Sequence, residues 1–224
     1  MSSDGLRTAG RTGRAARRAQ LLRAARAVFV AQGFHATAMD DIADSAGVSK
    51  PVLYQHFSSK LALYQALLED SAAEMVRRIE QAITDSDDNS LRVHGAVRAY
   101  FDFVSDESQA FRLIFESDLR DEPSVAVIVN QAIDACIAAV SKIITVDTGA
   151  DTASARLLAA GLVGLSQVSA RYWLEQPDDV SRERAVSLIA TLAWRGIAHV
   201  PLQEAAVGGP ATANGVEAHP IASC

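Results

Sequence analysis

Apolar residues recur at helical spacing along almost the whole chain. Leu21, Ala25 and Phe29 lie four residues apart, and residues 125–143 repeat the pattern over a longer stretch. Such spacing places apolar side chains on one face of an α-helix, and no segment shows the alternation typical of a half-buried strand. The pattern predicts an all-α fold of about nine helices, at residues 14–32, 37–45, 49–57, 59–84, 90–105, 107–117, 123–145, 151–176 and 180–199.

The two ends of the chain depart from this pattern. Residues 1–13 are basic and carry few apolar side chains, and residues 203–224 are rich in Gly, Ala and Pro. Neither segment buries enough apolar surface to offset the entropy of ordering it. We therefore expect a flexible basic arm at the start and a flexible tail at the end.

Charge is distributed unevenly along the chain. Residues 1–60 hold nine Arg or Lys against four Asp, a balance of +5, and the remainder holds 12 basic and 23 acidic residues, a balance of −11. The net charge of −6 thus combines a basic first segment with an acidic body. This asymmetry favours a polyanion as the partner of the first segment, although a solvated charged arm gives the same balance.

Several classes of protein have no support in the sequence. No apolar run approaches the ~20 residues of a membrane span and no signal peptide is evident, so we expect a cytoplasmic protein without a membrane partner. Cys136 and Cys224 indicate no disulfide framework, and the five histidines lack metal-ligand spacing. No phosphate loop or nucleophile motif stands out, so neither an enzyme nor a bound metal is indicated.

Residues 37–57 indicate a helix, a tight turn and a second helix. We expect Thr37 to cap the first helix with Asp40 reaching back, Gly47 to supply the positive φ of the turn, and Ser49 to cap the second helix. Apolar residues of both helices then form a common inner face. The outward face of the second helix consists of Lys50, Pro51, Val52, Tyr54, Gln55 and His56.

The outward face carries groups that suit DNA. Lys, Tyr, Gln and His side chains bind phosphates and the base edges of the major groove. The helix starts at Thr37, Ser49 and Lys60 add free N–H groups that can hold phosphates. The pattern predicts a helix-turn-helix with a recognition helix, against the alternative of a three-helix cap with incidental surface polarity.

The TetR family of bacterial regulators has a signature that residues 47–60 resemble: Gly-Val-Ser-Lys-Pro-Val-Leu-Tyr-Gln-His-Phe-Ser-Ser-Lys. The resemblance implies that Tyr54, His56 and Lys60 grip phosphates. It also implies that Lys50 to Val52, with Gln55, read bases. Leu61 departs from the family pattern, in which a Glu often follows that Lys, and this leaves the cap of the next helix open.

The resemblance extends over about residues 15–202. Residues 100–119, 161–174 and 193–202 are similar to the actinobacterial fatty-acid-synthesis regulators of this family. This implies double-stranded operator DNA as the partner, fatty-acid synthase genes as the target and a long-chain acyl-CoA as the effector, with no other cofactor. The implied domains are an arm at 1–13, a helix-turn-helix domain at 14–58, an effector-binding and dimerisation domain at 59–202 and a tail at 203–224.

Aromatic residues cluster on two predicted helices of the body. Five of them fall within sixteen positions, namely Tyr100, Phe101, Phe103, Phe111 and Phe115. Ordinary core packing explains such a cluster, and the family resemblance favours a ligand pocket instead. The predicted effector site consists of Phe101, Phe111, Phe115, Ile128, Ala132, Leu162 and Leu165.

Small residues recur on the last two predicted helices, from Ala155 to Gly164 and from Ala190 to Ala198. Small side chains let helices approach closely, and the family resemblance implies a homodimer through residues 151–199 on a palindromic operator. Close packing inside one chain is the alternative for this pattern.

Two other functions remain open from the sequence. A drug-efflux regulator that senses bulky hydrophobic cations would place acidic groups beside aromatic ones, and Asp102, Glu116 and Asp134 could serve it. An acyl-handling helical protein that is not a regulator is the other alternative, and it lacks the chemistry of a hydrolase or transferase.

Overall fold

The computed structural model describes residues 4–106, 119 and 122–197, with side chains described from residue 13 to residue 196. No β-strand occurs in these ranges, and the predicted all-α fold is confirmed. The predicted helix at 107–117 and the tail at 203–224 lie outside the described residues. The helices are α1 (Asp4–Ala36), α2 (Met39–Ser45), α3 (Lys50–His56), α4 (Lys60–Thr84), α5 (Asn89–Val104), α7 (Pro123–Thr148), α8 (Thr152–Glu175) and α9 (Arg182–Ile197).

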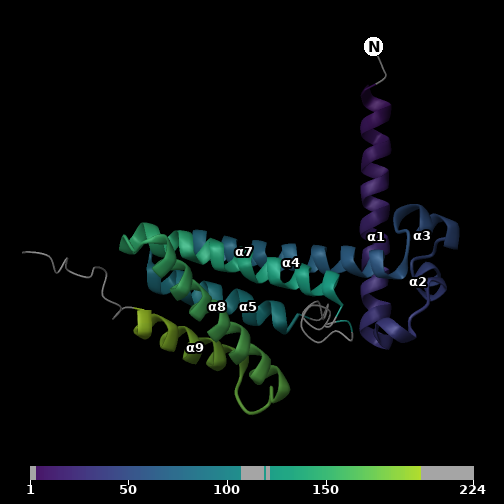
Figure 1. The fold of residues 1–224 in the computed structure, drawn as a ribbon. Helices are drawn as coiled ribbons and strands as arrows, with labels where there is room; N and C mark the ends of the chain where they lie inside the picture. Colours follow the sequence, from purple (N-terminus) through teal and green to yellow (C-terminus); the bar gives the residue numbers. More distant parts are fainter. Residues whose placement is uncertain (1–3, 107–118, 120–121, 198–224) are drawn as a thin grey trace, which may run out of the picture.

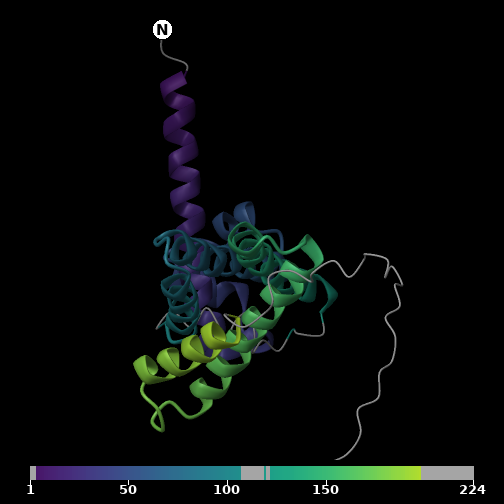
Figure 2. The ribbon, with the colours of Figure 1, turned by 90° about the vertical axis from the view of Figure 1, so that its left-hand side faces the viewer.

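The molecule consists of a small head and an elongated helical body (Figure 1). Helices α1, α2 and α3 form the head, and α4 leaves the head and runs beside α7 along the body. Helix α5 contacts α4, α8 and α9, so that α5 lies inside the bundle. The first half of α1 stands clear of everything else, as two perpendicular views show (Figures 1 and 2).

Helix α1 begins at Asp4, ten residues before its predicted start at 14. The predicted flexible arm at 1–13 is therefore helical from Asp4 onward. The added residues alternate Arg, Ala and Thr with single glycines and contain no proline, so the helix that begins at the apolar face is free to continue toward the N-terminus.

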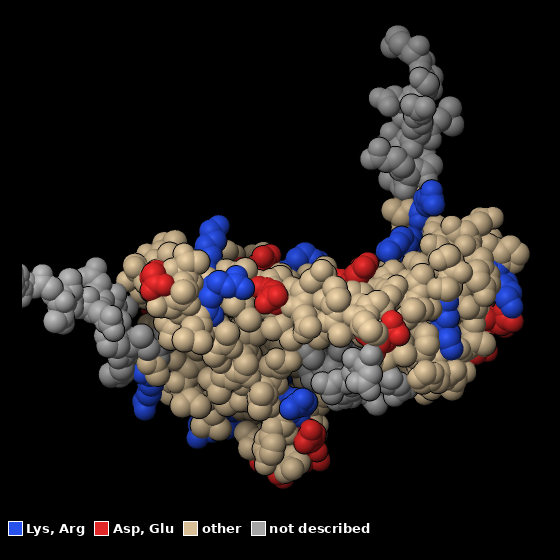
Figure 3. Space-filling view, in the orientation of Figure 1, with Lys and Arg blue, Asp and Glu red and all other residues tan. Residues whose placement is uncertain are grey.

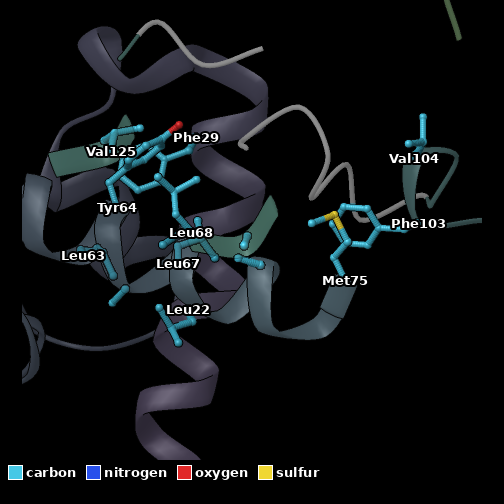
Figure 4. Close-up of a cluster of buried hydrophobic side chains, with 14 of the residues drawn as sticks. Leu22, Phe29, Leu63, Tyr64, Leu67, Leu68, Met75, Phe103, Val104 and Val125 are labelled. Carbon is cyan, nitrogen blue, oxygen red and sulfur yellow. The ribbon is translucent and has the colours of Figure 1, made fainter. Parts of the chain in front are cut away.

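One hydrophobic core runs from the head into the body. The Phe29 ring of α1 meets the Tyr64 ring of α4 edge to face at 5.1 Å between centroids, and the Phe34 ring meets Tyr64 at 5.2 Å. Val125, at the start of α7, is 1% exposed and lies beside Tyr64 and Phe29 (Figure 4). The core residues of α1, α4 and α7 thus form a single cluster, and the head is packed onto the body rather than hung from it.

Among the described residues, α7 alone is long and apolar enough to cross a membrane by length and composition. The sequence reading, which counted no such apolar run, did not anticipate this. In the structure α7 packs along both α4 and α8. These contacts give its apolar residues protein neighbours in the helical body.

Gly33 interrupts α1 close to its end. Its φ of 77° and ψ of 167° lie in a region that only glycine adopts readily, and three residues later the helix ends at Ala36. This break turns the chain toward α2. The position of α2 against α1 therefore depends on the absence of a side chain at residue 33.

Replacing Gly33 by Ala should destabilise the protein by about 1–3 kcal/mol, because alanine is strained at this φ and ψ. Gly13 is the matched control, since it lies in the helix and an added Cβ there meets nothing within 4 Å. Gly13→Ala should raise stability slightly, by up to about 1 kcal/mol. Urea unfolding followed by circular dichroism measures both. Equal stability of Gly33→Ala and the wild type would contradict the strain assigned to Gly33.

Candidate functional site: an exposed helix and an apolar cavity

The turn between α2 and α3 fixes which face of α3 is buried. Gly47 has a φ of 63°, as predicted, and its N–H donates to the Asp44 carbonyl at 3.0 Å. The N–H of Val48 then donates to the Ala43 carbonyl at 3.0 Å. Leu53, which is fully buried, anchors α3 on the head. The opposite face of α3 must therefore point away from the core.

The outward face of α3 matches the predicted set. Lys50, Pro51, Tyr54 and Gln55 are exposed, and Val52 and His56 are half-buried. Ser49 precedes the helix as its N-cap, and its exposed hydroxyl makes no capping hydrogen bond. This surface offers a cation, a phenol, an amide and an imidazole within two helical turns, which is a set able to contact phosphates and base edges.

Lys50 is paired with an acidic neighbour in the free protein. Its ammonium lies 2.8 Å from an Asp40 carboxylate oxygen, and both side chains are more than half exposed. The hydrogen bond to Asp40 is the main reason why the pKa of Lys50 is raised. Because the pair is exposed to water it is weak, so a phosphate or a base can displace Asp40.

Two predicted phosphate contacts are corrected by the structure. Thr37 is 2% exposed and donates its hydroxyl to the Gly33 carbonyl at 2.7 Å. Ala38 is the N-cap of α2 instead, and its N–H donates to the Asp41 carboxylate at 2.9 Å. Thr37 was expected to be exposed at a helix start, but the break at Gly33 turns it inward.

Lys60 is the second correction. Its ammonium donates to the carbonyls of Phe34 and Thr37 at 2.8 Å each, and to that of His35 at 3.3 Å. An ammonium has three N–H donors, so none is left for a phosphate. Free carbonyls at the end of a helix attract a cation, and Lys60 here ties the end of α1 to the start of α4.

Sequence reasoning left out three exposed arginines near the head. Arg14, Arg17 and Arg18 lie on α1, and the guanidinium of Arg18 stands 5.3 Å from the Phe57 ring centroid. Figure 3 shows Lys and Arg side chains where the projecting helix meets the head. The basic balance of residues 1–60 signalled them, but no motif placed them beside α3. They add positive charge next to the exposed face of α3.

A second feature is a cavity of about 290 Å³ in the body. It lies among α4, α5, α7, α8 and α9, toward the end of the bundle remote from the head (Figure 1). Its wall is mostly aliphatic, and includes Ile79, Ile83, Val93, Ala96, Val97, Val140, Ile143, Ile144, Leu158, Leu162 and Val163. A cavity with such a wall favours a hydrocarbon ligand.

Polar groups in the wall are concentrated at one ion pair. Arg92 donates to Asp147 at 2.8 Å, and also to the Ser86 carbonyl at 2.6 Å and to the Asn89 side chain at 2.9 Å. The side chains of Arg92 and Asp147 are only 17% and 21% exposed. Their mutual neutralisation leaves this end of the cavity polar and close to electrically neutral.

The predicted effector residues are only partly brought together. Leu162 lines the cavity, whereas Ile128, Ala132 and Leu165 do not. Phe101 is fully buried against Trp173, with 5.7 Å between ring centroids, as the core alternative required. Phe111 and Phe115 lie outside the described residues.

The wall contributed by α5 was missed. Asn89, Arg92, Val93, Ala96, Val97 and Tyr100 all line the cavity. Their spacing of three and four residues marks one helix face, so the signal was present in the sequence. The aromatic cluster drew the prediction to Phe101, which faces the neighbouring side of the same helix.

A third feature is an exposed apolar stripe along α8 and α9. It consists of Leu157, Val168, Tyr172, Leu188 and Leu192, all at least 47% exposed. On α8, Gly161 and Gly164 lie between these residues, and a Cβ on either glycine meets nothing within 4 Å. The small residues Ala155, Ala159, Ala190 and Ala193 are buried inside the chain instead. The predicted small-residue face therefore divides into an internal set and an exposed set.

Comparison with known proteins places these features in a family. Residues 21–67 match the family described as bacterial regulatory proteins, tetR family. The chain is 49% identical over 200 residues to the HTH-type transcriptional activator FasR of Mycolicibacterium smegmatis, covering 89% of this chain and 91% of the relative. It is 38% identical over 89 residues to the transcriptional repressor KstR2 of Mycobacterium tuberculosis H37Rv, covering 39% of this chain and 44% of the relative.

Solved structures share the fold. A TetR-family regulator from Mesorhizobium loti matches with a TM-score of 0.70 at 20% identity, covering 82% of this chain and 96% of that chain. The regulator FadR from Bacillus subtilis, solved in complex with stearoyl-CoA, matches with a TM-score of 0.65 at 18% identity, covering 78% of this chain and 96% of that chain. With the extensive identity to FasR, these findings show that the chain is a FasR-like member of the TetR family of transcriptional regulators.

Proposed function

We propose that the chain is a cytoplasmic, dimeric regulator of fatty-acid synthesis genes whose affinity for a palindromic operator is controlled by a long-chain acyl-CoA. The observation that carries the proposal is the 49% identity to the activator FasR along 89% of the chain. The aliphatic cavity supports it, because a hydrocarbon chain needs such a wall. FadR, which has the same fold, was solved with stearoyl-CoA.

The described part of the cavity favours an acyl chain over a cationic drug. A cation needs an unpaired carboxylate, and the acidic residue of the described wall, Asp147, is paired with Arg92. Asp102 lies 3.3 Å from Arg182, and Asp134 is 69% exposed. Glu116 lies outside the described residues. We therefore retain drug sensing only as an outcome that the ligand experiment below can reveal.

The DNA contacts are assigned to α3 and its neighbours. Lys50, Val52 and Gln55 read bases, and Ser49, Tyr54 and His56 hold phosphates, with Pro51 shaping the start of the helix. Thr37 and Lys60 are omitted because their polar groups are engaged inside the head. The described residues hold no group of three or more potential metal ligands, and we propose no enzymatic activity.

The operator requires two heads related by a two-fold axis. We assign the dimer contact to the apolar stripe of α8 and α9, because an exposed patch of this kind marks an interaction surface. Gly161 and Gly164 allow a partner helix to approach closely. The resulting four-helix contact would set the distance between the two α3 helices.

Binding to DNA should be specific and salt-dependent. We expect affinity to fall on the order of a thousandfold or more between 50 and 200 mM salt, since many phosphates release counterions. Tyr54→Phe should weaken all sequences alike, whereas Gln55→Ala should relax preference at one base pair by about 1–3 kcal/mol. Footprinting and fluorescence anisotropy measure these effects. Protection without two-fold-related half-sites would argue against the assigned surface.

Charge on the stripe should dissociate the dimer. Leu157→Glu and Gly164→Arg should raise the dimer dissociation constant on the order of tenfold or more, because a charge would be buried without a partner. Light scattering measures the mass, and circular dichroism checks that the helices persist. Leu91→Glu is the control, since Leu91 is 61% exposed on α5, away from the stripe. Ala193 is unsuitable as a probe because it is buried and lines the cavity.

Chain length should set the response to the effector. Each methylene that enters the cavity contributes about 0.8 kcal/mol, or about a fourfold gain in affinity, until the space is filled. Titrating the protein on its operator with acyl-CoA of increasing length, free coenzyme A and a cationic dye tests this. Short acyl-CoA and free coenzyme A should change operator affinity little. A response to the dye alone would favour the drug-sensor function.

A further inference from the structure

The cavity wall carries one hydroxyl that lacks a hydrogen-bond partner among the described residues. Tyr100, on α5, lines the cavity and is 4% exposed, and its phenolic oxygen is buried and unbonded. Buried polar groups in folded proteins nearly always have a partner, so an unsatisfied one indicates an absent ligand or a functional role. Its neighbours in the wall are aliphatic, which makes the missing bond unfavourable.

Other polar side chains of the wall are already engaged. Arg92 is held by Asp147, Asn89 and the Ser86 carbonyl. The hydroxyl of Thr148 donates to the Ile144 carbonyl at 2.7 Å, and that of Ser166 donates to the Leu162 carbonyl at 3.0 Å. A ligand that uses these groups must first break their bonds, whereas the Tyr100 hydroxyl is available at once.

We propose that the Tyr100 hydroxyl donates a hydrogen bond to the acyl carbonyl oxygen of the bound thioester and so distinguishes an acyl chain from an alkyl chain. This inference rests on the proposed acyl-CoA response. The carbonyl oxygen is the one hydrogen-bond acceptor at the root of an acyl chain, and the remainder of the chain needs only apolar neighbours. The wall offers the same combination, with Val93, Ala96 and Val97 continuing the face of α5 on which Tyr100 lies.

The state of the hydroxyl suits this role. Burial is the main cause that raises the pKa of Tyr100 above its ordinary value. The group therefore stays protonated at neutral pH and remains a donor. A site that offers a buried donor discriminates strongly against a ligand without the matching acceptor, because the donor is then left unpaired in the complex.

A pair of ligands that differ at the carbonyl tests the proposal. Palmitoyl-CoA carries the thioester oxygen, and S-hexadecyl-CoA has the same number of chain carbons without it. The full-length dimer should bind palmitoyl-CoA about tenfold or more tightly than S-hexadecyl-CoA, as measured by calorimetry. Tyr100→Phe should bind the two alike, because the ring remains and the donor is gone. Tyr172→Phe, at a tyrosine that is 65% exposed, should keep the wild-type ratio.

The stability of the free protein gives a second readout. Tyr100→Phe removes an unsatisfied hydroxyl and keeps the ring, so its Tm without ligand should equal or exceed that of the wild type by a few degrees. A lower Tm would show that Tyr100 is bonded in the free protein and would overturn the proposal. A Tyr100→Phe variant that loses affinity equally for both ligands, or keeps the wild-type ratio, would also overturn it. If the wild type binds neither ligand, the proposed function fails too, whereas equal binding of both defeats the carbonyl contact alone.

Discussion

Helix α4 must be buried in two places at once, and the rest of the molecule is arranged around that requirement. Its first turns lie in the head, where Tyr64 packs against Phe29 and Phe34. Its last turns line the cavity through Ile79 and Ile83. A helix is stiff over this length, so a ligand that displaces the second part also moves the first. Coupling between the cavity and the head then needs only two preferred positions of α4.

Two further contacts make this coupling specific to the junction. Lys60 joins the start of α4 to the last carbonyls of α1, and the Gln65 amide donates to the Ser124 hydroxyl of α7 at 2.7 Å. Both lie within the first two turns of α4. The head therefore follows α4, and α7 supports the same point from the body side. Rotation of the head has to break or carry along these bonds, which favours rigid-body movement over local bending.

The parts that could be predicted from the sequence are those fixed by local interactions. Gly47 sets the turn, Leu53 sets the buried face of α3, and the exposed set from Lys50 to His56 follows from helical spacing. Lys60 and Phe101 resisted prediction for the opposite reason. The partners of Lys60 lie at least 23 residues away, and Phe101 packs against Trp173, so the outcome depended on long-range packing. The cavity likewise needs five helices to define it.

The pairing of Lys50 with Asp40 bears on how such a protein searches a chromosome. In the free head the carboxylate of Asp40 occupies the cation of the reading helix, and a random stretch of DNA must compete with it. Non-specific DNA offers phosphates alone, whereas an operator also offers base edges to Gln55 and Val52 once Lys50 is released. The acidic neighbour thus lowers the residence time on unrelated sequences more than that on the operator. Weak retention between sites lets the protein sample more of the genome in a given time.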